Sequence, residues 1–230
     1  MSSERHRLPQ FNVINALDMK FSRPFLILIT LVALFNHLAL AQADYRPGLF
    51  FREDWKEIPA QIPITPEHVA NPDLIMSTYG PGADSLKKSN HDQPVDDPYY
   101  IWSGRCLDNW AMTLKHKNQS VDLSKFARIK WRSKQAGYRH LRVILKLSDG
   151  QWLVSDVADG PSDDWRITEF VVDNIKWRQL DIENVVEGRW VDNPDLSSVE
   201  EIGFTDLMRG GNSAACSRLD WIEVYGFPVN

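Results

Sequence analysis

The sequence predicts an all-β protein, built as a single antiparallel β-sandwich or jelly roll. Short segments rich in β-branched and aromatic residues alternate apolar with polar positions, which is the pattern of half-buried strands. Polar turn residues separate these segments, and no apolar run of helical period reaches helix length. Many short strands with polar turns between them are typical of sandwiches and jelly rolls.

The expected elements follow one another with short gaps. Strands are expected over 109–117, 127–135, 141–149, 151–157, 167–174, 175–182, 199–207 and 217–226. Asp149-Gly150 falls between two of them and predicts a type I′ hairpin turn. One helical turn is expected over 65–73, because Thr65 can cap it and Pro72 ends it.

The start of the chain predicts a removable leader. From Met19 a short basic head precedes an apolar run, 25–40, and small residues follow it up to Ala43. This is the layout of a secretory signal peptide, and the run is shorter than the roughly 20 residues of a membrane-spanning helix. We therefore expect residues 1–43 to be removed by cleavage after Ala43, leaving one β-sandwich domain, 44–230, that is secreted or periplasmic. An uncleaved anchor is the alternative.

The net charge limits the kinds of partner that the chain could bind, and the two cysteines raise the question of a disulfide. The formal net charge is −5 for the chain and about −7 for residues 44–230, which argues against a nucleic-acid partner. Export permits a disulfide between Cys106 and Cys216, but sequence does not show that they come within reach. A disulfide and two buried free thiols therefore both remain open.

The last third of the chain carries a family resemblance. Leu196-Ser197, Ile202-Gly203-Phe204 and Leu219–Glu223 stand in the order of a strand, a glycine-containing loop and a final strand. This segment resembles the closing strands of galactose-binding-like jelly-roll domains, including the family named after a complex I intermediate-associated protein. Many such domains are carbohydrate-binding modules or accessory parts of glycan-degrading enzymes, so the resemblance implies a carbohydrate partner. A fold alone does not fix function.

Basic residues gather on one side of several strands. In 127–135, Arg128, Lys130 and Arg132 point one way, while Ile129 and Trp131 point the other. Three further expected strands repeat the arrangement, and if all four share a sheet its outer surface is a cationic plate. Such a plate would suit a uronate-bearing or sulfated polysaccharide. The alternative is that these are ordinary solvated side chains.

Tryptophan is the second compositional signal. The chain contains nine, and a flat indole can cover the apolar face of a sugar ring. Most lie on the apolar side of an expected strand and are assigned to the core. Trp102, Trp165 and Trp190 lie beside polar or turn segments, so they are the expected ligand contacts.

The segment 87–102, KKSNHDQPVDDPYYIW, is the candidate for catalysis. His91 could act as a base, Tyr99 or Tyr100 as a proton donor, and Lys87, Lys88 or Arg105 as the cation that neutralises a sugar carboxylate. That set suits β-elimination. The alternative is a solvated loop stiffened by its two prolines.

The same segment offers oxygen ligands. Asp92, Asp96 and Asp97 could hold Ca²⁺, and a structural Ca²⁺ is also common in the jelly rolls that the chain resembles. No cofactor motif is present, and none is expected. The adjacent Asp96 and Asp97 fit a paired-carboxylate hydrolase less well, since neighbouring side chains diverge.

A second polar cluster follows the strand expected at 199–207. Asp206 and Arg209 stand beside a glycine-rich turn shortly before Cys216, and loops on a rigid sandwich are common places for ligand sites. They complete the predicted ligand-binding set.

The sequence thus predicts a secreted carbohydrate-binding protein whose partner is an anionic polysaccharide or oligosaccharide. A freestanding polysaccharide lyase or glycoside hydrolase using residues 87–105 is the alternative. A structural or assembly protein is the second alternative.

Overall fold

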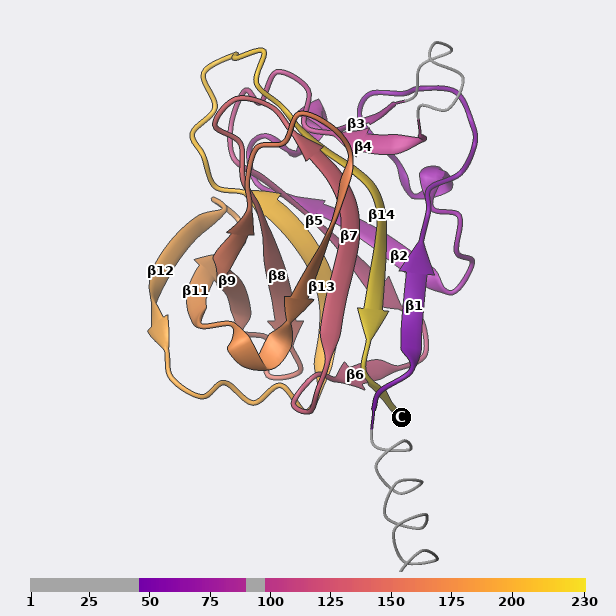
Figure 1. Cartoon of the computed structure of the whole chain (residues 1–230), viewed down its shortest axis with the longest axis vertical. Helices are drawn as coiled ribbons and strands as arrows, with labels where there is room; N and C mark the ends of the chain where they lie inside the picture. The colour runs from indigo at the N-terminus through magenta and orange to yellow at the C-terminus, as the bar shows by residue number, and fades with distance from the viewer. Residues whose placement is uncertain (1–45, 90–97) are drawn as a thin grey trace, which may run out of the picture. The chain divides into compact units, whose positions relative to one another are not determined.

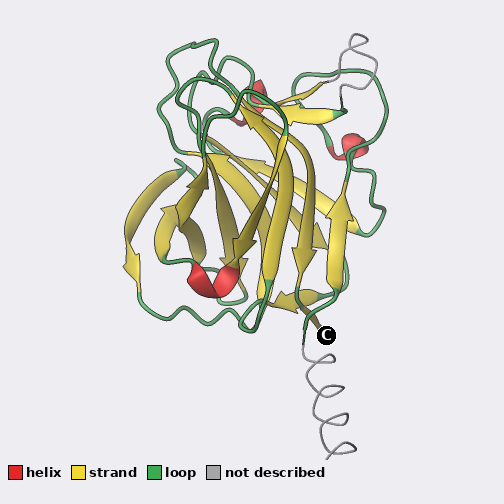
Figure 2. Ribbon diagram, in the orientation of Figure 1, coloured by secondary structure: helices red, strands yellow, loops and turns green. Residues whose placement is uncertain are grey.

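Two antiparallel β-sheets face each other in the computed structural model, which describes residues 46–89 and 98–230 (Figure 1, Figure 2). The predicted all-β sandwich of jelly-roll type is confirmed. Within the described residues the helical elements are short 3-10 turns: η1 (Pro66–His68), η2 (Ala83–Ser85) and η3 (Val172–Asn174). The expected leader, residues 1–43, lies outside the described residues.

The first sheet has six strands. Its order is β10 (Arg166–Val171), β7 (Arg128–Gln135), β14 (Ser217–Tyr225), β4 (Tyr100–Trp102) and β3 (Lys87–Ser89), and β1 (Leu49–Glu53) also pairs with β14.

The second sheet has nine strands. Its order is β12 (Val186–Val191), β11 (Trp177–Asp181), β9 (Trp152–Asp159), β8 (Leu141–Leu147), β13 (Val199–Asp206), β5 (Trp110–His116) and β2 (Leu74–Tyr79), with β6 (Ser120–Asp122) paired to β13 and to β15 (Phe227–Val229). The strands expected from sequence are all found, with shifted ends. The helical turn expected over 65–73 is found as the 3-10 turn η1. Thr65 precedes it and forms a capping box with His68, in which each side chain accepts a bond from the other residue's backbone N–H.

The hairpin expected at Asp149-Gly150 joins β8 to β9. Gly150 N donates to Leu147 O at 3.0 Å, and Leu147 N donates to Gln151 O at 2.9 Å. The first of these bonds makes Ser148 and Asp149 the central residues of the turn, and neither has a positive φ; Gly150, which follows them, has a φ of +87°. The hairpin is therefore confirmed, but its turn is not type I′, which needs a positive φ at both central residues.

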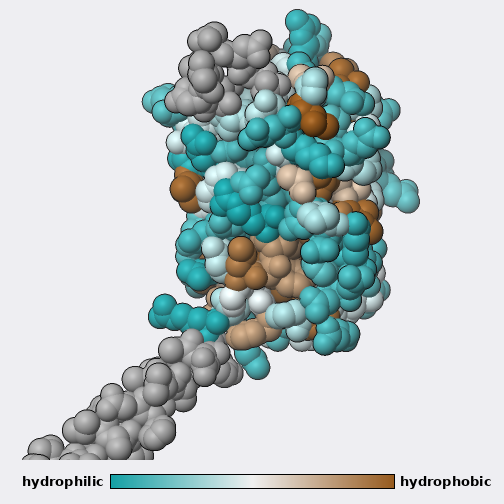
Figure 3. Space-filling model, turned by 90° about the vertical axis from the view of Figure 1, so that its right-hand side faces the viewer, coloured by the Kyte–Doolittle hydropathy of each residue, from teal (hydrophilic) through white to brown (hydrophobic). Residues whose placement is uncertain are grey.

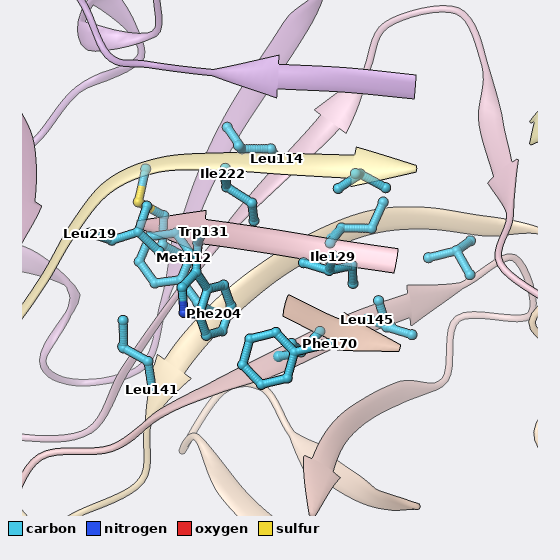
Figure 4. Packing of buried hydrophobic residues seen from close by; sticks show 14 of the residues in the cluster. Met112, Leu114, Ile129, Trp131, Leu141, Leu145, Phe170, Phe204, Leu219 and Ile222 are labelled. Atoms are coloured by element: carbon cyan, nitrogen blue, oxygen red, sulfur yellow. The ribbon is translucent and has the colours of Figure 1, made fainter. Parts of the chain in front are cut away.

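The core fills the space between the sheets (Figure 4). Trp131 of β7 lies at its centre, with its ring centroid 4.5 Å from that of Phe170 and 6.4 Å from that of Phe204. Ile129 on the same strand is buried with them, and the residues between are partly exposed. Strand alternation thus divides β7 into a core side and an outer side, as predicted.

A second, smaller apolar cluster covers the outer face of the nine-stranded sheet. It consists of Ala111, Ile144, Val154, Leu180 and Val185. Val185 belongs to the turn between β11 and β12, and Asn109 Nδ2 donates to its carbonyl at 2.9 Å. This turn therefore lies over part of the sheet, and the outer face of the six-stranded sheet has no such cover among the described residues.

The two cysteines are free and buried, so the disulfide alternative is not the one found. Their segments are nevertheless joined by backbone: Ser103 N donates to Ser217 O at 3.0 Å, and Ser217 N donates to Ser103 Oγ at 2.9 Å. The end of β4 and the start of β14 therefore lie side by side without a covalent link.

Within 46–89 and 98–230, no helix combines the length and hydropathy needed to cross a bilayer.

Candidate functional site

Aromatic side chains gather on the outer face of the six-stranded sheet. We define the aromatic face by Trp102, Trp165, Trp221 and Tyr225, all partly exposed. In β14 the buried Ile222 forces its neighbour Trp221 outward, because successive side chains of a strand point to opposite faces. Trp102 lies on β4, which pairs with the start of β14, and Trp165 directly precedes β10.

Each of these rings lies against a basic side chain. The distances from the cationic group to the ring centroid are 4.4 Å for Arg52 over Trp221, 4.9 Å for Arg128 and 5.5 Å for Lys130 over Tyr225, 5.4 Å for Arg132 over Trp165, and 5.2 Å for Lys87 over Trp102. A cation in this position is worth about 0.5–1 kcal/mol at an exposed site. The contacts also fix the rings in place.

Acidic groups pair with most of these cations. Arg52 forms ion pairs of 2.5 Å with both Asp54 and Glu223, and these two carboxylates raise the pKa of its guanidinium. Arg132 is 2.7 Å from Asp220. Burial raises the pKa of the Asp220 carboxyl despite this partner.

Two basic residues of β7 share a fourth acid. Glu169 of β10 lies 3.0 Å from Lys130 and 3.8 Å from Arg128. The three predicted cationic contacts, Arg128, Lys130 and Arg132, are thus all on the aromatic face, and all are ion-paired.

The cationic plate predicted from sequence is wrong in its extent. It required four strands to share one sheet, but β7 lies in the six-stranded sheet, and β5, β8 and β11 lie in the nine-stranded sheet. The bases of these three strands also have acidic partners: Lys115 and Glu200 at 3.6 Å, Arg142 and Glu187 at 2.9 Å, Lys146 and Glu201 at 3.0 Å, and Arg178 and Glu187 at 3.6 Å. Which strands become neighbours is decided by pairing between distant segments, which local alternation does not reveal.

Trp102 Nε1, at one end of the aromatic face, is buried and has no hydrogen-bond partner among the described residues. Gln135 Oε1 also has none, but it lies on the core side of β7. Since a buried polar group without a partner costs about 1–3 kcal/mol, the Trp102 end of the face can gain from a ligand or water that supplies the missing bond.

The predicted catalytic set is not assembled within the described residues. His91 lies outside them. Tyr100 is only 2% exposed, with its ring 5.3 Å from that of Trp165, and the Tyr99 ring lies 3.9 Å from Lys88 Nζ. Arg105 bonds Asn212 at 3.4 Å on the neighbouring loop. Tyr100 is therefore enclosed by its neighbours instead of facing a ligand.

Asp206 has a structural role, which corrects its assignment as a ligand contact. Its carboxylate is fully buried, 3.4 Å from Arg139, and accepts bonds from Ser217 Oγ at 3.1 Å and Met208 N at 2.9 Å. Arg209 is exposed, and it lies on the loop that Arg139 holds.

The predicted calcium ligands Asp92, Asp96 and Asp97 lie outside the described residues. Among the residues that are described, no group of His, Cys, Asp and Glu side chains could hold a metal ion. Trp190, the third predicted stacking residue, is on β12 of the nine-stranded sheet, away from the aromatic face.

Sequence reasoning missed Trp221, Tyr225 and Arg52. In the segment 217–226, Trp221 and Tyr225 share one side of the alternation with Glu223, opposite Ile222. Aromatic residues that share one side of a strand with a charged residue are expected to face outward, and this is the signal that could have identified Trp221 and Tyr225.

The surface near β1 is largely polar. Figure 3 shows the side of the molecule at the right of Figure 1, where apolar side chains form small groups separated by polar ones. Over the described residues on this side, no apolar area is broad enough to suggest a second contact surface.

Comparison with known proteins finds distant structural similarity. No family model and no curated protein matches the chain. Among solved structures, it is similar to the family 11 carbohydrate-binding module of the cellulosomal cellulase Lic26A-Cel5E of Clostridium thermocellum, at 14% identity over 78% of this chain and 95% of that one, with a TM-score of 0.43.

Two further modules are comparable. The family 29 module CBM29_1 from Piromyces equi is 12% identical over 77% of this chain and 91% of that one, with a TM-score of 0.42. The family 30 module of the cellulosomal cellulase Cel9D-Cel44B of Clostridium thermocellum is 11% identical over 79% and 98%, with a TM-score of 0.40.

Proposed function

We propose that the protein binds carbohydrate through the aromatic face. The observation that carries the proposal is the convergence of Trp102, Trp165, Trp221 and Tyr225, from three separate segments, on the outside of one sheet. A sugar ring presents C–H groups on its faces, which stack on aromatic rings, and hydroxyls at its edge.

The paired charges supply groups that can bind hydroxyls. Arg132 and Asp220, and likewise Arg52 and Glu223, place donors and acceptors within a few ångström of a ring. Because each ion pair already holds its side chains in place, less side-chain conformational entropy is lost when a ligand binds. The face therefore offers stacking and oriented hydrogen bonds together, as a sugar requires.

An anionic sugar is the preferred ligand in this proposal. At the Trp102 end, Lys87 and Arg218 lie on the outer side, and Lys134 has only a 3.9 Å contact with the largely exposed Asp164. A uronate or sulfate group on the ligand would be attracted to this end.

Binding to polysaccharides, by affinity electrophoresis and calorimetry, tests the proposal. The panel contains neutral, uronate-bearing and sulfated polymers. We expect Trp221→Ala and Tyr225→Ala each to weaken binding by about tenfold or more, as removal of a central contact does. Ile75→Ala, an exposed apolar position on β2 of the nine-stranded sheet, is the control and leaves binding unchanged.

Two results would contradict the proposal: no binding to any polymer, or equal affinity of the wild type and both aromatic variants. Preference for neutral over anionic polymers would retain carbohydrate binding and remove the anionic specificity. The lyase or hydrolase alternative stays a prediction centred on His91, and new unsaturated or reducing ends in the same incubations would support it.

A further inference from the structure

The centre of the aromatic face is electrically balanced. On β7, Lys130 lies 3.0 Å from Glu169 and Arg132 lies 2.7 Å from Asp220. Each base in the middle of the strand therefore has an acid in close contact, and little positive charge is left there for a ligand.

The Trp102 end of the face carries a row of bases. Lys87, Trp102, Arg218 and Lys134 oppose one another in turn across β3, β4, β14 and β7. Directly opposed side chains have Cβ atoms about 4.5–5.5 Å apart, and like charges in that position are destabilising. In this row only Lys134 has an acidic partner among the described residues, the 88% exposed Asp164 at 3.9 Å. An acid group bound here would relieve the repulsion between Arg218 and Lys134.

The opposite end of the face has a hollow that contains two arginines. Its volume is about 240 Å³, and the described residues that line it are Arg46, Phe126, Arg128 and Val171. Tyr225 and Val171 oppose Arg128 on its two neighbouring strands, so the hollow adjoins the outer side of the sheet. Arg128 is 3.8 Å from Glu169, and Arg46 has no ion-pair partner among the described residues.

The size and charge of this hollow suit one acid group. It is smaller than the roughly 300–1,000 Å³ of pockets that enclose a whole ligand. A guanidinium can donate two parallel hydrogen bonds to a carboxylate or a comparable oxyanion, and Arg46 and Arg128 supply two guanidinium groups.

The two ends are about 20 Å apart. Arg128 and Lys134 are six residues apart on β7, and an antiparallel strand rises about 3.4 Å per residue. One sugar ring cannot reach both ends, whereas a chain of several rings lying along β7 and β14 can. Its middle rings would lie over Trp221, where the charges of the face are paired.

We propose that the two ends of the aromatic face are separate subsites for acid groups, carboxylate or sulfate, of one polysaccharide chain that lies along β7 and β14. The inference rests on the function proposed above. It adds a second acid subsite, at Arg46 and Arg128, and a minimum length for the ligand. A chain that reaches both subsites binds more tightly than either end alone, because its second contact forms at a high effective concentration.

Calorimetry with oligosaccharides of two lengths tests this arrangement. The probes are a disaccharide and a hexasaccharide of galacturonate, the same two lengths of sulfated galactose, and a neutral hexasaccharide. We expect an acidic hexasaccharide to bind about tenfold or more tightly than its own disaccharide. The galacturonate and sulfated series distinguish carboxylate from sulfate as the recognised group.

Variants that remove one charge at each end locate the subsites. Arg46→Gln and Arg218→Gln are each expected to lower the affinity for the acidic hexasaccharide about fivefold or more and to leave that for the neutral one unchanged. Lys115→Gln, which removes a base from β5 of the nine-stranded sheet, is the matched control and leaves both affinities unchanged.

Two results would overturn the inference and leave the proposed function in place. One is an acidic hexasaccharide that binds no more tightly than its disaccharide. The other is an Arg46→Gln variant, shown to be folded by thermal unfolding, that binds the hexasaccharide as the wild type does. Absence of binding to acidic and neutral oligomers alike would overturn the proposed function together with the inference.

Discussion

Glu201 is a buried carboxylate with three donors directed at it. It is 5% exposed, and it accepts bonds from Thr113 Oγ1 at 2.6 Å, Lys146 Nζ at 3.0 Å and Tyr79 Oη at 2.9 Å. Burial favours the neutral acid, but the hydrogen bonds from Thr113, Lys146 and Tyr79 outweigh it and hold the pKa below its ordinary value. The ionised form is therefore the one that the fold stabilises.

This lowered pKa predicts a loss of stability in acid. A carboxylate with a depressed folded-state pKa contributes stability at pH above its unfolded pKa, about 4.3, and that contribution is lost as the pH falls through the folded pKa. We expect Glu201→Gln to cost about 1–3 kcal/mol at pH 7 and to reduce the decline below about pH 5. Urea unfolding across this range measures both, and parallel stability curves for the two proteins would contradict the assignment.

Arg139 and Asp206 form a buried pair with fully enclosed side chains. The guanidinium also donates to Met208 O at 2.9 Å and to Ala215 O at 3.1 Å, so it ties the β13–β14 loop to the sandwich. Burial raises the pKa of Asp206, since Arg139 and the hydrogen-bond donors offset only part of the desolvation cost.

Removing one member of this pair leaves the other charge unbalanced. We expect Arg139→Met to lower the free energy of unfolding by about 3–5 kcal/mol, and the double variant with Asp206→Leu to recover part of it. Denaturant unfolding of both variants provides the comparison. A single variant as stable as the wild type would show that the pair contributes nothing.

At the scale of the strand, alternation predicted the elements but not their neighbours. β7 and β14 were expected at 127–135 and 217–226 and were found within a residue or two, because the period of two is clear over eight or nine residues. β3 and β4 are three residues long, too short for a period to show. Which sheet a strand joins depends on distant pairing, and this is why the cationic plate failed.

For the candidate site too, the sequence predicted individual residues but not which of them become neighbours. Trp102 and Trp165 were found because polar segments flank them. Trp221 was missed because it lies within an alternating strand and the charged positions on its side of β14 went unused. Their meeting on one face is a property of the sheet and needed the structure.

Adjacent residues of β14 test this division directly. Ile222 is fully buried, so Ile222→Ala is expected to cost about 2–5 kcal/mol of stability. Trp221→Ala, on the outer side, is expected to cost less and to impair binding instead. Unfolding and binding measured on both variants decide the matter, and the reverse ranking of stability losses would refute the assigned faces.

At the scale of the molecule, many charged side chains of the described residues lie in ion pairs at the surface. The formal net charge is only −5, and exposed pairs of this kind contribute about 0–1 kcal/mol each. Stability therefore depends chiefly on the two apolar clusters and not on the charged faces.

Added salt is expected to separate stability from binding. Screening weakens the attraction between exposed charges and a polyanion, so affinity for sulfated or uronate polymers should fall between low and near-molar salt. The midpoint of thermal unfolding should move by only a few degrees. Salt-independent affinity would show that the Trp102 end does not recognise the acid groups.

The twist of the six-stranded sheet bears on the physical state of its partner. The rings of the aromatic face stand on β4, on β14 and just before β10, and neighbouring strands of a sheet are rotated by about 20–25°. The rings therefore lie along a twisted surface and not a flat one. A rigid crystalline facet could touch only part of such a surface, whereas a single hydrated chain can turn about its own axis and meet ring after ring.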